Sequence, residues 1–161
     1  MRDVLDHVLG GRAASEDALR WQRADTFAGI QANYEALTDQ VAESGLTESE
    51  RLSISLRVAA AHRNNSLTEW YGDLLSESGA SVWEVASIID GTHSATGRLA
   101  PLLDYSTTVA VDPASVGAER IAALAAAGFT EREIVTVSQL IGFVSYFSRI
   151  ISGLEALRAA S

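Results

Sequence analysis

Cysteine is absent from all 161 residues of the sequence. This absence excludes disulfide bonds, zinc–thiolate sites, cysteine-ligated iron–sulfur clusters and every mechanism that uses a thiolate. Lysine is absent as well, since all twelve basic residues are arginine. Schiff-base chemistry needs an amine and is therefore excluded too. Because no phosphate-binding loop or metal-ligand spacing can be recognised, we expect neither a cofactor nor a metal ion.

Positive charge is also scarce, because twelve arginines stand against 21 acidic residues and give a formal net charge of −9. An acidic surface repels phosphate backbones and anionic lipid headgroups, so we expect neither a nucleic acid nor a membrane as partner. The sequence opens without an apolar run of signal-peptide length, and we expect a cytoplasmic protein.

Apolar residues recur at helical spacing along nearly the whole chain, and no segment reads convincingly as a strand. Three capping boxes mark helix starts, at Thr47–Glu50, Ser81–Glu84 and Thr130–Glu133. We therefore predict an all-α fold in one domain, residues 1–161. The central part is a helical hairpin over 48–78 with an Asn-rich connection. The other expected helices lie around 4–8, 27–37, 82–89, within 95–109, from 113 to 127, and over 131–157.

The helix predicted over 131–157 is apolar on most sides. No charged residue occurs from Ile134 to Ser148, a stretch shorter than the roughly 20 residues that span a bilayer. We expect a buried central helix, or one that packs against another subunit. Because a monomer cannot hide so much apolar surface, the sequence predicts a homo-oligomer. A dimer is the first choice, with a trimer or a hexamer as alternatives.

Two segments resemble the carboxymuconolactone decarboxylase family, which includes the AhpD alkylhydroperoxidases. The run Leu46-Thr47-Glu48-Ser49-Glu50-Arg51, followed by Leu56-Arg57-Val58-Ala59, is similar to the opening of that domain. The run from Gly128 through Thr130-Glu131-Arg132-Glu133 to Arg149 is similar to the long helix of the peroxidase-related branch. The resemblance implies an all-α, AhpD-like domain that assembles as a homo-oligomer. Residues 46–157 would form the family-like core, and residues 1–45 a helical extension.

The resemblance also shows what this chain has lost. AhpD enzymes carry a Glu and then Cys-x-x-Cys-x-x-x-His, and these four positions fall on Leu52, Asn64, Leu67 and Tyr71. Neither Asn nor Leu can act as a thiolate, so thiol peroxidase activity is excluded. The decarboxylases of the family need no cysteine, but their Gly-x-Pro ending of the second helix is missing here. The chain therefore resembles a cysteine-less branch of these proteins.

Several residues near the hairpin connection could still carry chemistry. A histidine beside a carboxylate can act as general acid or base, which makes His62 and Glu69, with Tyr71, the candidate catalytic residues. The alternative is structural: His62 would cap a helix end, Glu69 would be solvated and Tyr71 would belong to the core.

Asn64 and Arg149 are the candidate substrate-binding residues. Arg149 follows the uncharged stretch and could hold an anionic substrate, or it could pair with a carboxylate such as Glu155 or one on another chain. Two function classes stay open at this point. One is a small-molecule acid–base enzyme that uses the 62–71 region, and the other is a non-catalytic binding or assembly partner.

Overall fold

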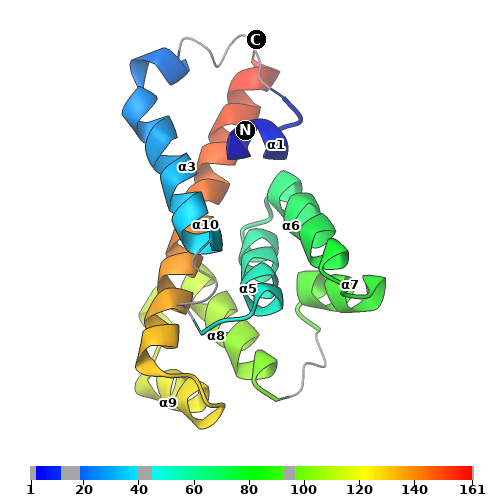
Figure 1. Cartoon of the computed structure of the whole chain (residues 1–161), viewed down its shortest axis with the longest axis vertical. Coiled ribbons are helices and arrows are strands. Elements are labelled where there is room, and N and C mark those ends of the chain that lie inside the picture. The colour runs from blue at the N-terminus through cyan, green and yellow to red at the C-terminus, as the bar shows by residue number, and fades with distance from the viewer. Residues whose placement is uncertain (1–2, 12–18, 40–44, 93–96, 161) are drawn as a thin grey trace.

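The computed structural model describes residues 3–11, 19–39, 45–92 and 97–160, and this part of the chain contains helices and no strand. The all-α prediction is thereby confirmed. The hairpin and the long apolar helix are both present, as Figure 1 shows. The elements are α1 (Val4–Val8), α3 (Ala24–Asp39), α5 (Glu48–Ala61), α6 (Asn65–Glu77), α7 (Val82–Asp90), α8 (Leu99–Val111), the 3₁₀ turn η1 (Pro113–Ser115), α9 (Ala118–Ala126) and α10 (Glu131–Ala159).

All three predicted capping boxes form. In each, the hydroxyl of the capping residue accepts from the backbone N–H three residues on, and the glutamate there accepts from the capping residue's backbone N–H. Thr47 and Glu50 start α5, with the Thr47 N–H donating to Glu50 over 2.8 Å. Two donors that would otherwise be unpaired are satisfied at each helix start, so these boundaries follow from local sequence.

The hairpin of α5 and α6 is the centre of the molecule, because α5 packs against α6, α7, α8 and α10. The side chains of Ile54, Leu56, Val58 and Ala59 are fully buried. The connection is tight: His62 ends α5, Arg63 takes a left-handed φ of 56°, and Asn64 caps α6.

Helix α10 is the longest element and runs along the molecule, with α3 beside it (Figure 1). It is long and apolar enough to cross a membrane by length and composition, but 44% of that apolar window is buried inside the protein. Val144, Phe147 and Ile151 are completely buried in the core. The helix is thus longer than the uncharged stretch that marks it in the sequence, and its inward side chains pack as a core helix does.

One predicted element is wrong in its boundaries. The continuous helix expected from 113 to 127 is divided into η1 and α9, because Val116 and Gly117 are extended between them. Pro113 favours a helix start, because proline is common at the first helical position. The extended Gly117 nevertheless separates this turn from the α-helix that follows. In α8, Pro101 lies in the first turn, where its missing N–H disrupts no helical hydrogen bond.

A charged cluster joins the start of three helices. Arg98, just before α8, donates to Glu50 of α5 over 2.6 Å and to Glu133 of α10 over 2.7 Å. Its guanidinium also lies 4.0 Å from the centre of the Phe129 ring. Gly45 closes the cluster, since its φ is +72° and a Cβ there would stand 2.8 Å from the Glu133 side chain. This cluster holds the starts of α5 and α10 close to the start of α8.

Candidate functional site

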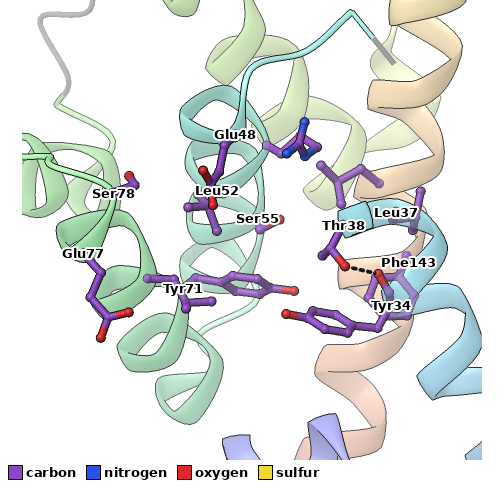
Figure 2. A pocket seen from close by; sticks show the side chains of 13 residues that line it. Tyr34, Leu37, Thr38, Glu48, Leu52, Ser55, Tyr71, Glu77, Ser78 and Phe143 are labelled. Carbon is purple, nitrogen blue, oxygen red and sulfur yellow. Dashed lines mark hydrogen bonds between the residues drawn. The ribbon is translucent and has the colours of Figure 1, made fainter. Parts of the chain in front are cut away.

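A pocket of about 310 Å³ opens among α3, α5, α6 and α10. We call it the tyrosine pocket, because Tyr34 from α3 and Tyr71 from α6 point their phenol oxygens toward each other there (Figure 2). Its apolar walls come from Leu37, Leu52, Leu74, Leu140 and Phe143. Its polar lining comes from Thr38, Glu48, Arg51, Ser55, Glu77 and Ser78. A mostly apolar cavity with a few convergent polar groups is the usual form of a small-molecule site.

Tyr71 is the innermost polar group of the pocket, and only 3% of the residue is exposed. Burial raises the pKa of Tyr71 well above its usual value. The neighbouring Tyr34 raises this pKa further, while a hydrogen bond with Ser55 lowers it in part. The phenol is therefore protonated at neutral pH and can exchange hydrogen bonds with a ligand. It cannot serve as a general base.

Arg51 brings a positive charge to the same pocket. It lies on α5 four residues before Ser55, so the two side chains share one face of the helix. Both are buried, although arginine is rarely buried without a partner. Burial lowers the pKa of Arg51, and the charges of Glu48 and Glu50 raise it in part.

An aromatic cluster supports the two phenols from behind. Trp70 lies 4.8 Å from Tyr71 and 5.6 Å from Tyr34, measured between ring centres, and 6.5 Å from Phe147 of the core. Such contacts restrict the ring orientations and connect α3 to α6 and α10. The phenols are thus held in place by packing around them.

The predicted catalytic residues do not come together. His62 meets Ser145 of α10, with 2.9 Å between its Nε2 and the serine oxygen, and does not line the tyrosine pocket. Burial lowers the pKa of His62, and the charge of Arg149 lowers it further. Glu69 is exposed and lines a separate open groove between α6 and α7, with Asp73. Of the three candidates, only Tyr71 faces the pocket.

The predicted binding residues also lie elsewhere. Asn64 is buried and uses its side chain within the fold, as the cap of α6 and as a donor to the Ser148 carbonyl at 3.1 Å and the Ser152 hydroxyl at 3.2 Å. Arg149 is exposed, where the sequence suggested burial, and it donates to the carbonyl of Ser145 at 3.2 Å. Neither residue lines the tyrosine pocket.

Polar contacts hold the hairpin connection against α10. Besides His62 and Asn64, the hydroxyl of Ser66 donates to the carboxylate of Glu155. Within the described ranges, no group of three histidine, aspartate or glutamate side chains could hold a metal ion. The three hydrogen-bonding residues His62, Asn64 and Ser66 join the hairpin connection to α10.

Comparison with known proteins gives a consistent answer at the level of structure only. No protein-family model matches the sequence, and no curated protein matches it. An uncharacterised peroxidase-related protein from Silicibacter sp. TM1040 superposes with a TM-score of 0.76 at 18% identity, over 93% of this chain and 78% of that one. The AhpD-core, uncharacterised peroxidase-related protein from Ralstonia eutropha JMP134 superposes with a TM-score of 0.76 at 20% identity, over 84% of this chain and 71% of that one.

The chain has the AhpD-like fold. A third solved structure with this fold is a cysteine-to-alanine variant of the debrominase Bmp8 in complex with 2,3,4-tribromopyrrole. It matches with a TM-score of 0.75 at 12% identity, over 96% of this chain and 84% of that one.

The four residues that the sequence resemblance aligns with the reactive positions of AhpD enzymes separate into two pairs in the structure. Leu52 and Tyr71 line the tyrosine pocket, whereas Asn64 and Leu67 lie in the interior at 3% and 0% exposure. The first pair therefore faces an open cavity, and the second pair belongs to the interior.

Sequence reasoning did not single out Arg51, Ser55 or Tyr34. A usable signal existed on α5, because Arg51 and Ser55 are four residues apart and share a face of the helix with Leu52 and Ala59. Two polar side chains at that spacing on a buried face indicate a polar patch inside the protein. For Tyr34 no such signal existed, because its spacing fits an ordinary core position.

Proposed function

We propose that this protein binds a small, largely apolar molecule in the tyrosine pocket and performs no thiol chemistry on it. One observation carries the proposal: Leu52 and Tyr71, which the sequence resemblance aligns with the carboxylate and imidazole positions of AhpD enzymes, line a cavity with buried hydrogen-bonding groups. A cavity with polar groups fixed at one side orients a ligand as well as enclosing it.

The similar structures support binding of a small ring in a protein of this shape. The Bmp8 debrominase holds 2,3,4-tribromopyrrole, a small halogenated aromatic. The apolar walls of the tyrosine pocket, with Phe143 and two tyrosine rings, suit a molecule of that kind.

An acid–base enzyme at the 62–71 connection has less support. His62 and Glu69 lie apart from the pocket and from each other, and Tyr71 keeps its proton. General acid–base catalysis needs the proton-transferring group within hydrogen-bond reach of the reacting atom. A binding protein requires only the cavity and its polar groups.

The proposal predicts that filling the pocket abolishes binding of a neutral apolar probe. We expect 1-N-phenylnaphthylamine to bind the wild-type protein with a rise in fluorescence, because the probe emits strongly in apolar surroundings. Leu52→Trp places a large ring in the cavity and should weaken binding by at least about 10-fold. Leu74→Trp, on the opposite wall, should act in the same direction.

Val111→Trp is the matched control, because Val111 is 63% exposed on α8 and does not line the pocket. It should leave probe binding unchanged. Circular dichroism and thermal unfolding establish that each variant is folded. Absence of probe binding to the wild type, or equal binding by all variants, would overturn the proposal.

A further inference from the structure

We propose that the ligand of the tyrosine pocket is a small monocarboxylate with an apolar body, held by its carboxylate on Arg51. The inference rests on the proposed binding function and adds the chemical class of the ligand. It follows from the donors that Arg51 leaves open, from the charges around it, and from the shape of the walls.

Arg51 is buried with most of its donors unused. Only 6% of the residue is exposed, and its Nη1 donates to the carbonyl of Leu46 over 2.7 Å. In the part of the chain that the structure describes, Arg51 forms no ion pair, and its Nε and Nη2 donate no hydrogen bond. Both nitrogens keep some contact with solvent. Neither is among the side-chain atoms of the described residues that are fully buried without a hydrogen-bond partner.

A guanidinium in this state is suited to a carboxylate. It presents parallel N–H groups that match two carboxylate oxygens, and such charge-assisted pairs are stronger than neutral hydrogen bonds. A buried cation that forms no direct ion pair is costly, so an anion that enters the pocket recovers part of that cost. Ser55 and Tyr71, on the same inner wall, can donate to the remaining oxygen lone pairs.

The other charged groups of the pocket limit the ligand to one negative charge. Glu48 and Glu77 also line it; both are exposed, so water screens their charges in part, and Glu48 still acts on Arg51. Figure 2 shows the Glu77 carboxylate turned away from the two phenols. A single carboxylate beside the buried Arg51 is favoured, whereas a second one at the mouth would meet these glutamates.

The remaining walls define the rest of the molecule. Leucines from four helices and the Phe143 ring enclose the space beyond the polar groups. Burying an apolar body there contributes about 25 cal/mol per Å² removed from water. A one- or two-ring aromatic acid, or an aliphatic acid of similar size, satisfies both ends of the pocket.

Isothermal titration calorimetry with two probes of equal shape tests the inference. 2-Naphthoate carries the carboxylate, and 2-naphthamide replaces it with a neutral group. We expect wild-type protein to bind the naphthoate about 10- to 100-fold more tightly, since a hydrogen-bonded charge has about that effect. A dianion of the same width, 2,6-naphthalenedicarboxylate, should bind more weakly than the naphthoate.

Arg51→Gln removes the charge and keeps a donor for the Leu46 carbonyl. This variant should lose the preference for naphthoate while retaining the affinity for naphthamide. Arg149→Gln is the control, because Arg149 is an exposed arginine outside the pocket, and it should change neither affinity.

Equal wild-type affinity for naphthoate and naphthamide would overturn the charge assignment and leave the binding function standing. Loss of naphthoate binding in Arg149→Gln but not in Arg51→Gln would overturn it as well. If neither probe binds, the binding function itself fails. Should Arg51→Gln not fold, the comparison of the three probes on the wild type still decides the question.

Discussion

Asn64 is a buried polar residue that uses both ends of its amide within the fold. Its Oδ1 accepts from the Leu67 backbone N–H over 2.9 Å, and its Nδ2 donates to Ser148 and Ser152 of α10. All of these bonds are formed with 3% of the residue exposed. A side chain that uses its polar atoms in this way fixes both the start of α6 and the distance from α6 to α10.

We predict that Asn64→Ala lowers the free energy of unfolding by about 2 kcal/mol, from the loss of a helix cap together with buried hydrogen bonds. Urea denaturation at neutral pH measures the effect. Asn65→Ala is the matched control, because Asn65 is exposed at the first position of α6, and it should stay within about 0.5 kcal/mol of the wild type. Equal stability of the two variants would contradict the structural role of Asn64.

At the scale of helices, the cluster around Arg98 connects the starts of helices that lie far apart in the sequence. Glu50 and Glu133 each belong to a capping box, and each also accepts from Arg98. Burial alone would raise the pKa of Glu133. The Thr130 backbone N–H, the Arg98 guanidinium and the Thr130 hydroxyl outweigh this effect, so the pKa is lowered. The stabilisation that the carboxylate supplies is complete above pH 4.5, the ordinary pKa of the glutamate in the unfolded chain. It is lost as the pH falls through the lowered pKa of the folded protein.

Glu133→Gln should therefore destabilise the protein by about 2 kcal/mol at pH 7, and by progressively less below about pH 4.5, where the carboxyl is protonated first in the unfolded chain and then, at lower pH, in the folded wild type. Thermal unfolding of both proteins between pH 7 and pH 3 measures the difference. Glu131→Gln, an exposed glutamate in the same helical turn, should cost only a few tenths of a kcal/mol at any pH. A pH-independent difference for Glu133→Gln would show that its charge is not what stabilises α10.

Local signals in the sequence were sufficient to predict most helix starts, and insufficient to predict the pocket. Thr47, Ser81 and Thr130 cap their helices by contacts with residues three positions away, so the pattern is visible in the chain itself. The break at Gly117 was missed because a proline start and an apolar stripe look the same with or without an extended glycine. The tyrosine pocket depends on where α3 packs against α10 and α6, which no short segment encodes.

At the scale of the whole molecule, apolar side chains remain on the outer side of α10. Val135 is 57% exposed and Tyr146 is 40% exposed, and Gln139 and Gly142 lie between them along one stripe of the helix. A second copy of the chain could cover such a stripe, so the homo-oligomer predicted from the sequence stays a prediction with a defined candidate surface.

Light scattering at micromolar concentration should give at least twice the 17.1 kDa of one chain, with a dimer as the first expectation. Tyr146→Glu should shift the mass toward the monomer, because it places a charge on the candidate interface. Val111→Glu, at an exposed position on α8, should leave the mass unchanged. A wild-type mass near that of one chain would refute the assembly.

The contacts of Trp70 give the protein an optical reporter of its own. Of the three tryptophans, Trp21 and Trp83 are 86% and 80% exposed, and their emission is that of indole in water. Trp70 is partly buried and touches both tyrosines of the pocket. Excited tyrosines at this distance pass their energy to it, and an acrylamide quencher in the solvent reaches it least. Occupancy of the pocket can therefore be followed in the blue-shifted, quencher-resistant part of the intrinsic fluorescence, with no label attached to the protein.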